Sequence, residues 1–158
     1  MKKLFKILAL VAVIFAGVGL AKAERVPCPV EKMPAQVQRF LNDYYPGAAV
    51  ESSWAKMMHP TTEPMWWRVN LKDGTKMQFT LDGTCSNISA KKSKTPIPVI
   101  LLPNEARKYL ADNYPNQTIV KYKFKKDQYK ITLSNGDKLV FDKDYQLAKV
   151  KKAKDKKK

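Results

Sequence analysis

The feature that most constrains the fold is an internal repeat, because the second half of the chain repeats residues of the first half in the same order. At one fixed offset, Pro34, Leu41, Asp43, Tyr45 and Pro46 match Pro103, Leu110, Asp112, Tyr114 and Pro115. At a shorter offset, Leu71, Gly74, Lys76, Phe79 and Asp82 match Leu133, Gly136, Lys138, Phe141 and Asp144. We therefore expect two related units. The change of offset places an insertion in the first unit, near residues 57–63.

Each unit is expected to begin with a helix and to continue as antiparallel strands. A proline that the first helical turn tolerates opens each unit, apolar residues follow at helical spacing, and Pro46 and Pro115 end the helices. After each helix the apolar residues recur at every second position, which is typical of half-buried strands. The pattern predicts an α+β fold.

Alternation of apolar residues also fixes the register of the hairpins. A two-residue turn at Asp73-Gly74 would place Val69 opposite Gln78 and mix the two faces of the sheet. A loop of three residues keeps one apolar face and puts Gly74 and Gly136 in left-handed conformations. The pairs expected from this register are Val69 with Met77, Trp67 with Phe79, Ile131 with Leu139, and Tyr129 with Phe141.

The repeat divides the chain into five segments. They are a leader over 1–23, a first repeat over 24–89, a linker rich in Lys, Ser and Pro over 90–99, a second repeat over 100–150, and a Lys-rich tail over 151–158 that we expect to be disordered.

The leader has the composition of a secretory signal peptide. A basic start precedes an uncharged stretch from Ile7 to Leu20, and Ala21 and Ala23 provide the small residues of a cleavage site. The competing interpretation is a membrane anchor, but the stretch is shorter than the roughly 20 residues that a spanning helix needs. We expect cleavage after Ala23, a mature protein without a transmembrane anchor, and a periplasmic or secreted location.

Export permits a disulfide, and the chain contains two cysteines, Cys28 and Cys85. A bridge between them would stabilise the fold by about 4 kcal/mol in the chain-entropy view. The alternative is two unpaired thiols, one of them buried. We favour the bridge.

Catalytic chemistry is poorly supported by the residues present. The chain has a single histidine, His59, and its acidic residues are scattered over turns and surfaces, so no nucleophile is paired with a base. We expect no enzyme and no cofactor. A soft copper site formed by Met57, Met58, His59 and Met65 is a weaker alternative to methionines that pack loosely beside the insertion.

One face of each sheet should pack on its helix, which leaves the other face to water or to a partner. On this outer face Trp66 is a large aromatic residue beside Arg68, and both residue types are enriched at interface hot spots. The candidate partner-binding residues are Trp66, Arg68, Asn70, Gln78 and Lys130. The alternative for Trp66 is packing against the insertion or the neighbouring unit.

The net charge of +16, from 30 Lys and Arg against 14 Asp and Glu, is unevenly distributed. It resides in the leader, the linker, the second unit and the tail, whereas residues 24–89 are neutral. Lys121, Lys123 and Lys125 alternate with aromatic residues and should share the outer face with Lys130, so they are candidate polyanion-binding residues. Nucleic acid is the weaker choice of polyanion for an exported protein.

The combined pattern resembles the PepSY-like family of exported bacterial proteins, also described as beta-lactamase-inhibitor-like. The residues that carry the resemblance are Tyr45-Pro46 and Tyr114-Pro115, Gly74 and Gly136, and Phe79 and Phe141. The resemblance implies two tandem repeats, each a helix on an antiparallel sheet, whose sheets can join into one concave surface. It also implies a non-enzymatic binding role, with a protein as the partner.

The leading expectation is an exported, non-catalytic binding module that contacts a protein or other macromolecule through the outer face of its sheet. The alternative is a structural protein associated with polyanions or with the cell envelope through its basic second repeat and its Lys-rich tail.

Overall fold

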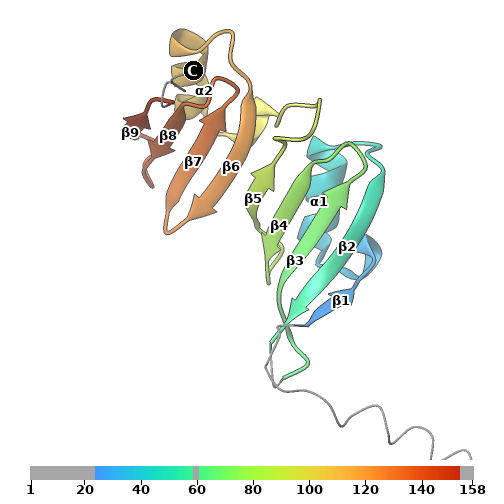
Figure 1. Cartoon of the computed structure of the whole chain (residues 1–158). Helices are drawn as coiled ribbons and strands as arrows, with labels where there is room; N and C mark the ends of the chain where they lie inside the picture. Colours follow the sequence, from blue (N-terminus) through green and yellow to red (C-terminus); the bar gives the residue numbers. More distant parts are fainter. Residues whose placement is uncertain (1–23, 59–60, 154–158) are drawn as a thin grey trace, which may run out of the picture.

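The computed structural model describes residues 24–58 and 61–153, which form one antiparallel sheet with two α-helices (Figure 1). The nine strands lie in the sheet in the order of the sequence. They are β1 (Arg25–Pro27), β2 (Val50–Met57), β3 (Pro64–Leu71), β4 (Lys76–Thr80), β5 (Cys85–Ser89), β6 (Ile119–Lys125), β7 (Gln128–Leu133), β8 (Lys138–Phe141) and β9 (Leu147–Lys151). The helices are α1 (Ala35–Tyr44) and α2 (Asn104–Asn113), preceded by the 3-10 helices η1 (Val30–Lys32) and η2 (Val99–Leu101).

Both α-helices lie between the prolines that the sequence predicts as their limits. Pro34 and Pro103 are the N-cap residues, where a missing N–H group costs nothing, and each helix ends two residues before the next proline. Phe40 of α1 meets the ring of Phe79 edge-on at 5.3 Å between centroids, and Tyr109 of α2 meets Phe141 in the same way at 6.0 Å. The two helices therefore cover the same face of the sheet.

The core is a continuous row of apolar side chains on this inner face. From β3 to β9, the successive cross-strand partners in this row are Val69, Met77, Ile88, Tyr122, Ile131, Leu139 and Val150. All but Val150 are buried, and Val150 packs against them. The two halves of the chain thus share one core.

The register expected from the sequence is confirmed. Val69 pairs with Met77 and Trp67 with Phe79, and the second hairpin pairs Ile131 with Leu139 and Tyr129 with Phe141. Gly74 and Gly136 have φ angles of +93° and +91°, as the three-residue loops require. The alternation of apolar side chains decided between the two possible loops, since the other loop would have buried polar residues.

The expected fold class, two tandem helix-on-sheet repeats, is wrong. The described residues form a single nine-stranded sheet that is more extensive than the helices covering it. The halves are joined because β5 pairs with β6, Asn87–Ser89 against Lys121–Lys123, and Ile97 adds an isolated bridge to Ile119. An edge strand presents unpaired N–H and C=O groups, and pairing β5 with β6 satisfies those groups within one chain.

Parts of the expected linker and of the expected tail are packed in the structure. In the expected linker, Ala90 and Ile97 are 3% and 2% exposed. In the expected disordered tail, Lys151 ends β9 and Lys152 forms an ion pair with Asp137 at 3.0 Å. Residues 151–153 are therefore ordered, because a carboxylate lies within reach of them. The rest of the tail and the whole leader, including its expected cleavage site, lie outside the described residues.

Candidate functional site

The outer face of the sheet, opposite the helices, is organised as two cross-strand rows. The first row runs from β1 to β9 as Pro27, Trp54, Arg68, Gln78, Asn87, Lys123, Lys130, Val140 and Lys149. The second runs from β2 to β9 as Ser52, Asn70, Lys76, Ser89, Lys121, Thr132, Lys138 and Lys151. Neighbouring strands are about 4.8 Å apart, so the stretch from Trp54 to Lys149 covers about 34 Å of sheet.

Both rows are basic, and neither contains an acidic residue. In residues 24–58 and 61–153, none of the lysines and arginines of these rows forms an ion pair with a carboxylate. The positive charge of the outer face is therefore left to solvent ions or to a partner.

Two tryptophans and two arginines form a cluster at the β1–β3 end of this face. The rings of Trp54 and Trp66 are 5.0 Å apart between centroids. The Cζ atom of Arg68 lies 5.5 Å from the Trp54 ring and 5.6 Å from the Trp66 ring, and the Cζ atom of Arg25 lies 4.8 Å from the Trp54 ring. Such cation–π contacts orient the guanidinium groups without neutralising their charge. We call Arg25, Trp54, Trp66 and Arg68 the Trp–Arg cluster.

Polar atoms of the outer face lack hydrogen-bond partners. The Nε atom of Arg68 and the Oδ1 atoms of Asn70 and Asn87 are buried and unpartnered within the described part of the chain. Burial, with a smaller contribution from Arg25, lowers the pKa of Arg68. Buried polar groups are normally hydrogen-bonded, so these atoms mark places where a partner could supply the missing bonds.

The structure brings together four of the five residues expected to bind a partner. Trp66, Arg68 and Asn70 project from β3 and Gln78 from β4, where the Nη2 atom of Arg68 donates to the Oε1 atom of Gln78 at 3.4 Å. Lys130 belongs to the same row as Arg68 but lies three strands from Gln78. Trp54 could not be predicted as part of this cluster, because β2 lacks clear apolar alternation.

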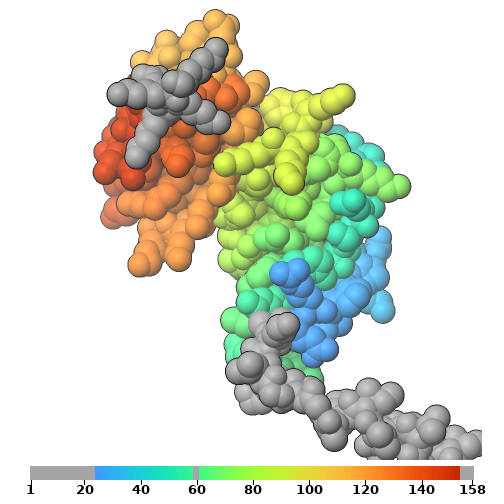
Figure 2. Space-filling model, viewed as in Figure 1, coloured from blue at the N-terminus to red at the C-terminus, as the bar shows by residue number. Residues whose placement is uncertain are grey.

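A cleft of about 610 Å³ opens near the middle of the outer face, between β5 and β6. Its lining residues are Gln78, Thr80, Asp82, Thr84, Ser86, Asn87, Lys123, Phe124, Lys125 and Lys126. The surface is visibly hollowed between the green strands and the orange strands (Figure 2). Of the lysines expected to bind polyanions, Lys121 lies in the second row, whereas Lys123 and Lys125 line this cleft.

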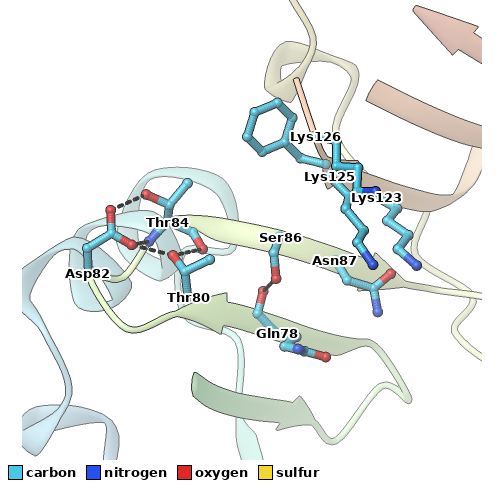
Figure 3. A pocket seen from close by; sticks show the side chains of 10 residues that line it. Gln78, Thr80, Asp82, Thr84, Ser86, Asn87, Lys123, Lys125 and Lys126 are labelled. Carbon is cyan, nitrogen blue, oxygen red and sulfur yellow. Dashed lines mark hydrogen bonds between the residues drawn. The ribbon is translucent and has the colours of Figure 1, made fainter. Parts of the chain in front are cut away.

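The two sides of the cleft differ in charge (Figure 3). Lys123, Lys125 and Lys126 occupy one side, and Asp82 lies on the other between Thr80 and Thr84. The hydroxyl groups of both threonines donate to the Asp82 carboxylate, that of Thr84 at 2.9 Å. These hydrogen bonds, first that from Thr80, lower the pKa of Asp82, so its carboxylate is ionised and already engaged in its own turn.

The residues of the copper alternative are only partly described by the structure. His59 lies outside them, and Met65 is 43% exposed. Met57 pairs across the hairpin with Pro64. Where the structure describes the chain, no group of three or more His, Cys, Asp or Glu side chains is placed to hold a metal ion.

The expected Cys28–Cys85 disulfide is not formed, and both cysteines are free. The backbone N–H of Cys28 donates to the Ser53 carbonyl of β2 from the side of β1, whereas Cys85 begins β5, four strands away from β1. Four spacings amount to about 19 Å, and a disulfide needs Cα atoms within about 7 Å. Burial raises the pKa of the Cys85 thiol to about 12, which keeps it protonated and unreactive.

Comparison with known proteins identifies the family. A profile of the family described as "Putative beta-lactamase-inhibitor-like, PepSY-like" matches residues 66–149, more than half of the chain. The chain belongs to this PepSY-like family. The matched segment begins within β3 and ends within β9, so it contains the cleft but not Trp54.

Solved structures from Bacteroides share the PepSY-like chain's fold. A putative periplasmic protein from Bacteroides vulgatus is 24% identical, with a TM-score of 0.72, and the alignment covers 83% of this chain and 99% of that one. A putative calcium-regulated periplasmic protein from Bacteroides thetaiotaomicron is 25% identical, with a TM-score of 0.72 and coverage of 80% and 96%. A second Bacteroides vulgatus protein, putatively periplasmic and of unknown function, is 22% identical, with a TM-score of 0.70 and coverage of 81% and 99%. No curated protein matches the chain.

The expected location of this PepSY-like protein is confirmed, since the similar structures are described as periplasmic. No helix in the described part of the chain is long and apolar enough to span a membrane. The protein is periplasmic or secreted.

Proposed function

We propose that this PepSY-like protein is an exported, non-catalytic binding module whose outer sheet face contacts a macromolecular partner, with a protein as the leading class. The observation that carries the proposal is the Trp–Arg cluster. It combines two half-buried tryptophans with arginines that have no carboxylate partner, on a face that no other element of the described structure covers.

The cluster has the composition of an interface hot spot. Tryptophan and arginine are the residues most enriched where truncation costs binding energy. The Arg68 guanidinium is held between two indole rings and keeps an unpartnered Nε–H, so an acceptor on a partner would gain an oriented donor. The inhibitor-like description of the family supports a protein partner and a non-catalytic role.

A second candidate is association with an envelope polyanion through the lysines of β6–β9. It is favoured by the two rows, which place Lys121, Lys123, Lys130, Lys138, Lys149 and Lys151 on one face without an acidic residue. Association of this kind releases counterions and weakens steeply as salt rises, whereas a contact centred on tryptophan does not.

One capture experiment separates the two candidates. The mature protein is immobilised, incubated with native envelope extract and washed at 50 and at 300 mM NaCl, next to Trp66→Ala and the control Ile100→Ala. Ile100 is 61% exposed in η2, on the helix side of the sheet. We expect a partner that survives the salt wash on wild type and on Ile100→Ala and is reduced at least tenfold on Trp66→Ala. Cross-linking should place that partner on β2 and β3.

Other outcomes are equally informative. Partners recovered equally by all three proteins would remove the Trp–Arg cluster from the proposal. Partners that all three proteins lose at 300 mM NaCl would favour the polyanion candidate.

A further inference from the structure

We propose that the cleft between β5 and β6 is a binding site for a small organic anion that also carries hydroxyl groups, such as an acidic sugar. This inference goes beyond the proposed macromolecular partner, because it concerns a different class of ligand and a cleft that contains no residue of the Trp–Arg cluster. It does not depend on Trp66.

The cleft exists because two paired strands separate. β5 and β6 pair only through Asn87–Ser89 and Lys121–Lys123, although β6 continues to Lys125 and β5 begins at Cys85. The register of β5 against β4 shifts next to Phe79, and a bulge of this kind bends its strand. The result is a cleft of about 610 Å³, within the size range of small-molecule sites.

The β6 side of the cleft supplies the positive charge. Lys123, Lys125 and Lys126 come from the end of one strand and the turn after it, and in the described residues none of them forms an ion pair. The carboxylate of Asp82 on the opposite side is engaged by Thr80 and Thr84. An anionic group would relieve the repulsion among the three ammonium groups, since like charges held together favour a counterion.

The floor of the cleft supplies an unsatisfied acceptor. The Oδ1 atom of Asn87 is buried and has no hydrogen-bond partner in the part of the chain described. Asn87 pairs across the strands with Gln78 on one side and with Lys123 on the other (Figure 3). A ligand hydroxyl would donate to this oxygen, whereas an oxyanion alone would place acceptor against acceptor. The preferred ligand therefore carries both an anionic group and a hydroxyl group.

The turn beside the cleft is a two-residue hairpin loop. Lys125 pairs with Gln128, and Lys126 and Asp127 between them have φ angles of +52° and +55°, as a type I′ loop requires. This loop places Lys126 against the cleft that it lines.

The experiment compares four probes that separate charge from hydroxyl groups. Glucose, glucuronate, glucose 6-phosphate and inorganic phosphate are titrated into the mature protein, and binding is followed by calorimetry and by the side-chain amide signals of Asn87 in NMR spectra. We expect at least one acidic sugar to bind at least tenfold more tightly than glucose and than inorganic phosphate, with a shift of the Asn87 signals. The two acidic sugars distinguish a carboxylate ligand from a phosphate ester.

Matched variants test the location of the site. Lys123→Gln/Lys125→Gln should weaken binding of the acidic sugar at least tenfold, and Asn87→Asp should abolish it, with melting temperatures close to wild type. The control Lys108→Gln/Lys143→Gln removes the same charge from exposed positions on α2 and on the β8–β9 turn and should change affinity less than twofold. Trp66→Ala should also leave affinity unchanged, which keeps this test separate from that of the proposed function.

Four results would overturn the inference. Three of them are no binding by any probe at 10 mM, equal affinity for glucose and the acidic sugars, and equal loss in the control and the cleft double variants. Inorganic phosphate binding as tightly as the acidic sugars would remove the hydroxyl requirement and refute the ligand class proposed here.

Discussion

Gly74 and Gly136 occupy equivalent positions in the two hairpins but have different surroundings. A Cβ atom added to Gly74 would lie 3.1 Å from the backbone oxygen of Lys92, whereas one added to Gly136 would lie 3.1 Å from the Cβ atom of Ala153. Three Lys92 atoms lie within 4 Å of the position beside Gly74, and two of them are backbone atoms, whereas only the Ala153 methyl carbon lies near the position beside Gly136. The same substitution should therefore cost more at Gly74.

We predict that Gly74→Val lowers the free energy of unfolding by about 1–3 kcal/mol from strain alone, with the close contact added to it. Gly136→Val should cost less than Gly74→Val, and Asn should be tolerated better than Val at both positions. The measurement is urea denaturation. Gly47→Asn is the control, because Gly47 also has a positive φ angle but no neighbour within 4 Å. Equal losses for the two Val variants would contradict the role given to Lys92.

At the scale of elements, the strands with strict alternation of apolar residues could be predicted, and the others could not. β3, β4, β7 and β8 alternate clearly, and their pairs are confirmed. β5 reads Cys-Ser-Asn-Ile-Ser and is mostly polar, and the register of β2 shifts between Val50 and Ser52. β2 and β5 are held in the sheet by backbone hydrogen bonds to a strand on each side, and such bonds do not require an alternating pattern of apolar residues. Trp54 and Asn87 lie on them and were missed for that reason.

The last strand is held at its carboxyl end by the side chain of Asp137. The Asp137 carboxylate accepts hydrogen bonds from the Ala153 backbone N–H at 2.8 Å and from the Lys152 ammonium at 3.0 Å. These bonds, first that from Ala153, lower the pKa of Asp137. Because the pKa of Asp137 is lower in the folded state than in the unfolded state, its ionised carboxylate stabilises the fold at any pH above its usual pKa. This stabilisation is lost as the pH falls through the lowered pKa.

We predict that Asp137→Asn reduces the hydrogen-exchange protection factor of the Ala153 amide at neutral pH, because the neutral amide is a weaker acceptor than the carboxylate. In wild type the same protection should persist at pH 6 and decline as the pH is lowered below 4. Asp144→Asn, in the exposed β8–β9 turn, is the control and should leave the Ala153 amide unchanged. Undiminished protection in Asp137→Asn would show that β9 pairing alone orders this segment.

At the scale of the whole molecule, the internal repeat led to the expectation of two units, but pairing of β5 with β6 makes one sheet of them. An internal repeat reflects the order of helices and strands within each unit. Whether the two units form one sheet depends on contacts between residues far apart in the chain. Ile88 and Tyr122 face each other across this junction, and Ile97 adds its buried side chain beside them. In the sequence, these three residues look like any other apolar core residues, so they do not reveal that they join the two halves.

The shared core predicts cooperative unfolding. Ile88 is 0% exposed, and its truncation to Ala should leave a cavity that costs about 2–5 kcal/mol. Because Ile88 joins both halves of the sheet, we expect one thermal transition in wild type and in Ile88→Ala. Hydrogen exchange should accelerate in parallel in β3 and in β7. Val99→Ala is the control, since Val99 is 52% exposed and should cost little. Two separate transitions, or faster exchange confined to β3 and its neighbours, would mean that the halves unfold independently despite their continuous sheet, and the cleft between β5 and β6 would then lie at a hinge between them.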